Sequence, residues 1–146
     1  MKIAVLLKQV PDLAEELEVD DSGKALDTEY IKFRLNEYDE HALEEAVCLK
    51  EAGEASEVTA IALDGEEVDK ALFTAMAKGA DKALKLTGTG AEGSRNAAAF
   101  FSEALDSEYD LIMTGVQSVD DREGMMGPML SACLLYTSPS PRDRTT

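Results

Sequence analysis

Four short apolar runs, each followed by a polar stretch or one with helical periodicity, constrain the fold of this chain more than any other feature. The runs are IAVLL at residues 3–7, EVTAIAL at 57–63, KALKL at 82–86 and LIM at 111–113. Continuous apolar runs of this length are typical of strands covered on both faces, as in a parallel sheet. Strands that alternate with amphipathic helices predict an α/β fold. We therefore expect one parallel sheet with flanking helices, the first run central and the more polar third run near an edge.

The segments between the runs carry the helical pattern. Apolar residues recur every three or four positions within residues 42–49, 68–76 and 97–105, which is the spacing of a helix with one buried face. Glycines that follow the first two patterns, Gly53 and Gly79, are expected to end those helices. Ser94 is expected to cap the third.

Two short segments depart from this alternation. Residues 9–12 (QVPD) are expected to break the first strand, because proline cannot donate to a sheet ladder. Residues 17–20 and 24–27 alternate weakly on either side of Asp21-Ser22-Gly23, and this pattern predicts a small exposed β-hairpin. The hairpin would lie outside the core.

The stretch LIMTGVQSVDDREGMMGP at residues 111–128 combines a strand end, a glycine and a polar loop that leads towards a helix. Gly115 allows the backbone to approach a ligand closely. Asp120 and Asp121 would repel a phosphate placed directly on them, so we expect them to cap the helix or to meet ribose hydroxyls. The helix begins either with Asp121 as its cap, which leaves Pro128 at a kink, or with Pro128 at its first position. The stretch matches neither the P-loop nor the dinucleotide fingerprint, so an ordinary strand-to-helix turn is an equal alternative.

The ends of the predicted strands supply a candidate site. Parallel strands end at one edge of their sheet, and open α/β sheets bind ligands there. We expect Leu6, the Asn36 to Asp39 corner, the Leu63 to Gly65 turn and the Gly115 to Gly124 loop to gather at that edge. The glycines of TGTGAEG at residues 87–93 formally fit G-x-G-x-x-G, but they follow the third strand and not the first, so we interpret this loop as a flexible connection.

Charge and composition exclude several classes of function. The formal net charge of −16 disfavours nucleic acids and anionic membranes as partners. No apolar run has membrane-spanning length, and no signal-peptide pattern precedes the first strand, so we expect an intracellular protein. Two cysteines form neither a disulfide framework nor a metal set, and one histidine removes most zinc sites and catalytic triads.

The last fourteen residues differ abruptly from the rest of the chain. Residues 133–143 read CLLYTSPSPRD and carry two of the four prolines. The string matches the in-frame translation of a transposase adapter used in sequencing libraries, so we interpret residues 133–146 as a non-native, disordered tail. The alternative is a genuine flexible tail.

Four blocks of sequence together resemble the amino-terminal part of the electron transfer flavoprotein β-subunit. They are KIAVLLKQVPD at residues 2–12, NEYDEHALEEAVCLKE at 36–51, AMAKGADKALKL at 75–86 and TGVQSVDDREGMMGPML at 114–130. The blocks occur in the order and spacing of that family, over residues 1–132. The resemblance implies an incomplete, truncated nucleotide-binding domain with a Rossmann-like parallel sheet and flanking helices, of the adenine-nucleotide-binding type.

The resemblance also implies a ligand and its contacts. Members of the family bury an AMP in this subunit, or a second FAD where they are electron-bifurcating. Bifurcating members often carry Thr-Ala-Gln-Val before the Gly-Pro pair, whereas this chain has Glu-Gly-Met-Met, which favours AMP. Carried over by position, the nucleotide contacts are Leu6, Asn36, Glu37, Tyr38, Asp39, Leu63, Gly115, Val116, Gln117, Ser118, Val119, Asp120, Asp121, Arg122, Glu123, Gly124, Met125 and Met126.

The function implied by the resemblance is electron transfer without catalysis by this subunit. The β-subunit would pair with an α-subunit that holds the redox-active FAD, and the heterodimer would pass electrons from acyl-CoA dehydrogenases of fatty acid oxidation, or from other dehydrogenases, to a membrane quinone oxidoreductase. The resemblance also implies a prokaryotic cytoplasmic location, no catalytic or metal-binding residues, no nucleic acid partner and no direct membrane insertion. Two alternatives remain: a universal-stress-type regulator that binds ATP, and an enzyme that holds Mg²⁺ with Asn36, Asp120 and Asp121.

Overall fold

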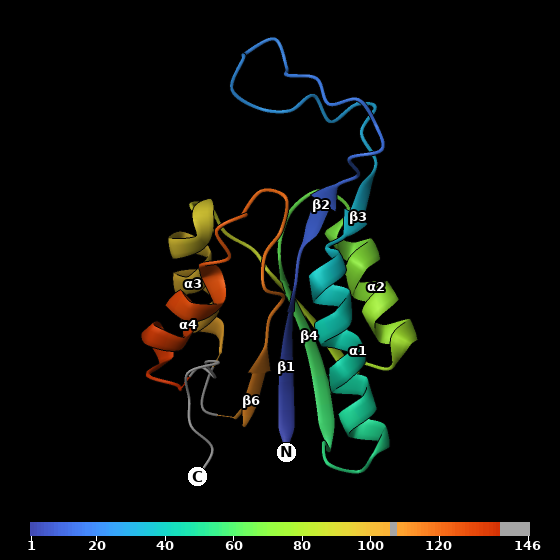
Figure 1. Ribbon diagram of the computed structural model, residues 1–146, viewed down its shortest axis with the longest axis vertical. Helices are drawn as coiled ribbons and strands as arrows, with labels where there is room; N and C mark the ends of the chain where they lie inside the picture. The colour runs from blue at the N-terminus through green and yellow to red at the C-terminus, as the bar shows by residue number, and fades with distance from the viewer. Residues whose placement is uncertain (106–107, 138–146) are drawn as a thin grey trace.

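Four strands run parallel in one sheet, as the apolar runs predict. In the computed structural model, which describes residues 1–105 and 108–137, they are β1 (Lys2–Leu7), β4 (Glu57–Leu63), β5 (Lys82–Leu86) and β6 (Leu111–Met113). Their order is β5-β4-β1-β6. The first run is therefore central and the third lies at an edge, as predicted. The fourth run, expected to be buried, forms a half-buried strand at the opposite edge (Figure 1).

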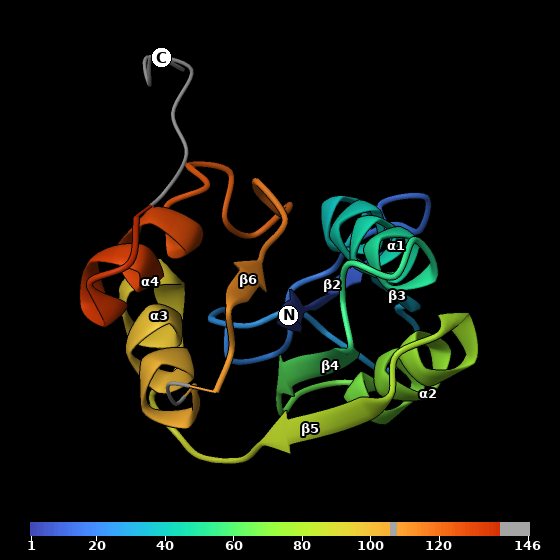
Figure 2. The same cartoon turned by 90° about the horizontal axis from the view of Figure 1, so that it is seen from below.

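Helices cover both faces of the sheet (Figure 2). α1 (Glu37–Glu51) and α2 (Val68–Lys78) lie on one face, and α3 (Gly93–Ala104) and α4 (Met126–Leu134) on the other. Successive residues of β1 point to opposite faces, so Ile3 and Val5 pack against the first pair of helices and Ala4 and Leu6 against the second. This double burial explains why β1 has no polar residue between Ile3 and Leu7.

The strand order places a change of direction at β1. The chain moves from β1 to β4 and β5 on one side and then crosses back to β6 on the other side of β1. Open α/β sheets bind ligands in the crevice outside the carboxyl ends of the strands at such a point. The crevice between the ends of β1 and β6 is therefore where this topology predicts a site.

A second, two-stranded sheet was not anticipated from the sequence. β2 (Gln9–Pro11) pairs antiparallel with β3 (Phe33–Leu35) directly after β1, where we expected only a break. Proline is tolerated because this small ladder has an open edge. The intervening residues 12–32 project beyond the rest of the molecule, at the top of Figure 1. The predicted hairpin within them is reduced to one antiparallel bridge between Val19 and Leu26.

The helix ends agree with some predictions and correct others. Gly53 and Gly79 follow α1 and α2 as expected. α3 begins one residue before Ser94, with Glu92 at the cap position. α4 begins at Met126, so Pro128 lies in the first turn, where its missing N–H would have no helical partner.

The carboxyl-terminal region is described only in part. α4 extends to Leu134, so the first two residues of the predicted tail are helical. Residues 138–146 lie outside the described residues, and the adapter origin of the tail stays a prediction. None of the helices in the described ranges combines the length and apolar composition needed to cross a membrane.

Candidate functional site

A cavity of about 530 Å³ lies at the carboxyl edge of the sheet. Its walls come from the residues that follow β1, β4, β5 and β6 and from the turn before α1. Leu6, Asn36, Leu63 and Gly115, which are far apart in the sequence, all line it. The convergence predicted from the strand ends is therefore confirmed.

Twelve of the eighteen predicted contact residues line this cavity. They are Leu6, Asn36, Asp39, Leu63, Gly115, Val116, Gln117, Ser118, Asp120, Asp121, Gly124 and Met126. Six do not line it: Glu37, Tyr38, Val119, Arg122, Glu123 and Met125. Helix geometry explains two of the six, because Asn36 and Asp39 are three positions apart and share a face, which turns Glu37 and Tyr38 away. Within the Gly115 to Met126 loop, a turn between Ser118 and Asp121 directs Val119 outwards.

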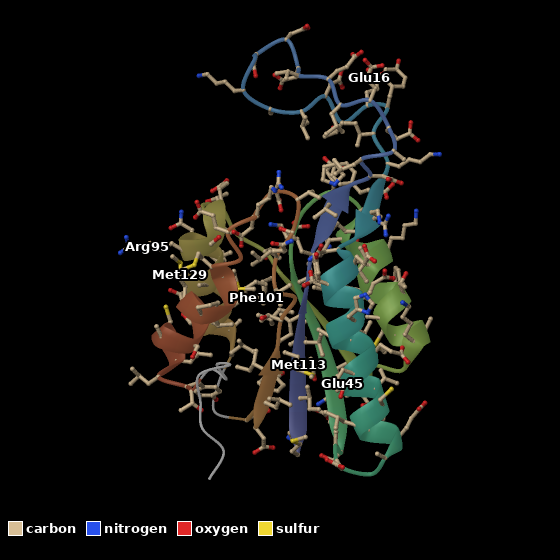
Figure 3. All side chains as sticks on the ribbon, viewed as in Figure 1. Glu16, Glu45, Arg95, Phe101, Met113 and Met129 are labelled. Carbon is tan, nitrogen blue, oxygen red and sulfur yellow. The ribbon has the colours of Figure 1, made fainter. Side chains whose placement is uncertain are left out.

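Sequence reasoning missed a large part of the wall. The β5–α3 loop, interpreted above as a flexible connection, contributes Gly88, Gly90, Ala91 and Glu92, and the start of α3 contributes Gly93 and Ser94. Phe101 of α3, labelled in Figure 3, lies between that helix and the sheet and also lines the cavity. The G-x-G-x-x-G spacing was a usable signal for this loop. Asp64 and Gly65 also line the cavity, as expected of the Leu63 to Gly65 turn. The other missed residues are Leu7, Lys8, Gln9, Phe33, Glu66, Val68, Ala97 and Gly127.

Asp39 ties the first turn of α1 to the start of the β6–α4 loop. Its Oδ1 accepts a hydrogen bond of 3.0 Å from the backbone N–H of Gly115. Gly115 is required there, because a Cβ at this position would collide with the Asp39 carboxylate and lie 2.9 Å from the Asp39 backbone nitrogen. Burial raises the pKa of Asp39 to about 6, although hydrogen bonds from the Asn36 side chain and from the Gly115 and Lys8 backbones act against the rise.

Asn36 makes a second tie to the same loop. This buried side chain donates from Nδ2 to the backbone carbonyl of Gln117 over 2.8 Å. The side chain of Gln117 in turn donates to the hydroxyl of Tyr38 over 3.3 Å. Tyr38 therefore supports the loop from outside the cavity and does not line the cavity itself.

A third tie joins β1 to the loop. Lys8 Nζ lies 2.7 Å from Asp120 Oδ1 and donates to Ser118 Oγ at 3.5 Å, while Ser118 Oγ donates to Asp120 Oδ1 at 2.5 Å. Burial opposes ionisation of Asp120, but the hydrogen bonds from Lys8 and Ser118 outweigh it and hold the pKa of Asp120 below its usual value. The Asp120 carboxylate is thus ionised and already paired.

Two further features shape the cavity. Gly124 has a φ of +64°, and a Cβ there would collide with the Val116 carbonyl, so only glycine closes this turn without strain. Gln9 donates from Nε2 to the backbone carbonyl of Glu67 over 3.2 Å. Its Oε1 is buried and has no hydrogen-bond partner among the described residues.

The chemistry of the wall is that of a binding site. Leu6, Leu63 and Phe101 offer an apolar surface, and the polar groups described above surround it. Within residues 1–105 and 108–137, no three His, Cys, Asp or Glu side chains are grouped so that they could hold a metal ion. The wall therefore combines apolar surface with a few polar groups, which is the usual composition of a small-molecule site.

Comparison with known proteins agrees with this architecture. A family model described as the electron transfer flavoprotein domain matches residues 24–137. The electron transfer flavoprotein subunit beta of Methylophilus methylotrophus is 33% identical over 138 residues, covering 92% of this chain and 52% of that protein. The subunit of Bacillus subtilis is 34% identical over 139 residues, covering 92% of this chain and 52% of that protein, and the mitochondrial subunit of Arabidopsis thaliana is 33% identical over 135 residues, covering 92% and 54%.

The matches cover most of this chain but only part of each relative. The chain spans about half the length of the curated relatives that it matches. The family model, in contrast, matches well over half of this chain. The relatives include bacterial and mitochondrial proteins, so the prokaryotic origin expected from the sequence stays a prediction. The chain belongs to the electron transfer flavoprotein family, and the relatives that it resembles are β-subunits of that family.

Proposed function

We propose that this chain is the nucleotide-binding part of an electron transfer flavoprotein β-subunit and that it holds AMP as a structural ligand in the cavity. The observation that carries the proposal is the meeting of Leu6, Asn36, Leu63 and Gly115 around one cavity beside the crossover at β1. These positions are the contacts that the family resemblance implies.

The residues present fit an adenine nucleotide. The cavity of about 530 Å³ is within the usual range for small-molecule sites, about 300 to 1,000 Å³. The apolar wall suits the adenine ring, and polar side chains of the wall such as Asn36, Gln117 and Ser118 offer hydrogen-bonding groups for the adenine amine and the ribose hydroxyls. AMP has no redox chemistry, so its contribution would be to join the turn before α1 to the β6–α4 loop.

Electron transfer would depend on the partner. The proposed heterodimer contains an α-subunit whose FAD accepts and donates electrons, while this chain orients and supports that subunit. Acyl-CoA or other dehydrogenases would supply the electrons and a membrane quinone oxidoreductase would receive them. Family membership favours this function over the universal-stress-type alternative.

A second FAD in place of AMP is the alternative ligand. The observation that favours it is the extra wall contributed by Gly88 to Ser94, which lies outside the positions implied for AMP. A larger ligand could extend along this loop. The Met125-Met126 pair, which departs from the bifurcating pattern, favours AMP.

Equilibrium binding tests the proposal directly. The full chain is titrated with AMP, adenosine, ATP and FAD by calorimetry, and separately expressed with an α-subunit of the family to see whether a yellow heterodimer forms. Saturable one-to-one binding of AMP supports the proposal. No binding of any adenine nucleotide, with a folded chain by circular dichroism, would overturn it, and binding of FAD with no affinity for AMP would replace AMP by the alternative ligand.

A further inference from the structure

Lys8 is the one positively charged side chain among the residues that line the cavity, all of which the structure describes. The same walls carry six carboxylates: Asp39, Asp64, Glu66, Glu92, Asp120 and Asp121. Charges of one sign around a partly enclosed site add to a common field. An anionic group of a ligand would therefore be repelled by these carboxylates and attracted by the Lys8 ammonium group.

The ion pair of Lys8 with Asp120 can be exchanged at low cost. The Nζ to Oδ1 distance is short, 2.7 Å, but the two side chains are 46% and 51% exposed. Ion pairs with this exposure contribute little to stability, because water solvates both partners when they separate. Asp120 is thus a weak competitor for the ammonium group of Lys8.

We propose that Lys8 is the phosphate-binding residue of this site and that the phosphate of a bound nucleoside monophosphate replaces Asp120 on its ammonium group. The inference rests on the proposed function, since it concerns the same cavity. A phosphate brings more negative charge than a carboxylate and more acceptor oxygens. Ser118, whose hydroxyl now donates to Asp120, becomes a second donor to the phosphate once Asp120 moves away.

The exchange does not require the loop to unfold. Asp39 holds Gly115, and Asn36 holds the carbonyl of Gln117. Backbone hydrogen bonds between Ser118 and Asp121 close the turn in both directions at 3.2 Å. Only the Asp120 side chain has to rotate, so the positions of the neighbouring backbone groups are retained.

Binding measurements can distinguish this exchange from an ion pair that has only a structural role. If Lys8 and Asp120 only hold the loop in place, removing either partner weakens binding of every ligand. If Asp120 competes with the phosphate, its neutralisation strengthens binding of a phosphate-bearing ligand. The Asp120→Asn variant separates the two, because asparagine keeps an oxygen that can accept from Ser118 and loses only the charge.

The test measures dissociation constants for AMP and for adenosine with the full chain and four variants. Lys8→Gln should weaken AMP binding about tenfold, the loss expected for one hydrogen bond to a charged group, and leave adenosine binding within about twofold. Asp120→Asn should strengthen AMP binding about threefold, because an exposed competing charge is removed. Adenosine, which lacks the phosphate, also reports whether each variant retains its fold.

A matched ion pair elsewhere in the chain provides the control. Lys85 Nζ lies 2.8 Å from Asp69 Oδ1, and neither residue lines the cavity. Lys85→Gln and Asp69→Asn should change neither dissociation constant. Equal effects of Lys8→Gln on AMP and adenosine, or weaker AMP binding by Asp120→Asn, would overturn the inference and leave the proposed function standing. A wild-type chain that binds neither ligand would overturn the proposed function and this inference with it.

Discussion

Replacing Asp39 with asparagine tests whether a buried carboxyl group makes stability fall as pH rises. Asp39 is 6% exposed, and its hydrogen-bond donors are neutral amides, namely the Asn36 side chain and the Gly115 and Lys8 backbones. Burial raises its pKa from the ordinary value of 3.8 to about 6. The folded chain therefore holds a proton on Asp39 at a pH where the unfolded chain has lost it.

The sign and size follow from proton linkage. Because the folded-state pKa is raised, the contribution of Asp39 to stability is fully present below about pH 4 and is lost as the pH rises through about 6. Between about pH 5 and about pH 7.5 the loss amounts to about 1.4 kcal/mol, a tenfold change in the folding equilibrium. Asparagine has no titrating proton and shows no such change.

The assay is urea unfolding of the wild-type chain and of Asp39→Asn at those two pH values. All other groups titrate in both proteins and cancel in the difference, so the free energy of unfolding of the variant relative to wild type should rise by about 1.4 kcal/mol from the lower to the higher pH. Asp20→Asn provides a control without a pH effect in this range. A hydrogen bond from the Ser22 hydroxyl lowers the pKa of Asp20 from its ordinary value of 3.8, so the stability that it contributes is lost only below both assay pH values, and the difference from wild type should be the same at the two.

One result would refute the reasoning about Asp39. If the difference between wild type and Asp39→Asn is the same at both pH values, the carboxyl group is ionised in the folded chain throughout this range. The backbone N–H groups of Gly115 and Lys8 would then outweigh its burial. A carbon-13 titration of the Asp39 carboxyl group by NMR gives the same answer directly.

Three further substitutions test the packing around the site. Gly115→Ala should destabilise the chain by about 2 to 4 kcal/mol, because the new Cβ meets backbone atoms of Tyr38 and Asp39 that cannot move aside; Gly65→Ala, where the corresponding space is open, should stay within about 0.5 kcal/mol by urea unfolding. Asn36→Ala should lower the free energy of unfolding by about 1 to 2 kcal/mol, because the hydrogen bond to the Gln117 carbonyl is lost. It should also raise the pKa of Asp39 further, so that the pH dependence of stability moves to higher pH, and an unchanged Asp39 titration would contradict this. Leu130→Ala should lower the free energy of unfolding by about 2 to 4 kcal/mol, since this side chain is buried between α4 and the sheet, whereas the exposed Leu135→Ala should have almost no effect.

The sheet and its helices were predictable because each carries a strong local pattern. The run from Ile3 to Leu7 is apolar without interruption, as expected of a strand that is covered on both faces. It forms the central strand β1. The small sheet of β2 and β3 was not predictable in the same way. Its strands have three residues each, Pro11 argues against one of them, and they meet across more than twenty residues of sequence.

The site was predictable at the level of loops and less so at the level of side chains. Parallel strands end together, so the loops had to meet. Whether a loop residue faces the cavity depends on local geometry: Ser118 faces it and Val119 does not, because the backbone turns between them. Lys8 and Gln9 were overlooked because Lys8 only bounds the first apolar run and Gln9 belongs to the segment that was expected to break the strand.

Polar ties cross the crevice and hold the loop that forms one wall of the cavity. The turn before α1 leads to one helical layer, and the β6–α4 loop leads to the other. Asp39 to Gly115, Asn36 to Gln117 and Tyr38 to Gln117 join the two at the carboxyl edge, and Lys8 after β1 pairs with Asp120 of the same loop. Each tie involves polar groups at an edge that contributes little buried apolar area. Side-chain changes in the ties of Asn36 and Lys8 should therefore alter nucleotide affinity more than stability, and changes in the core should do the reverse. This difference between affinity and stability follows from the position of the crossover at β1. The strands on either side of β1 share it as a core strand, but the loops after those strands meet only at the carboxyl edge.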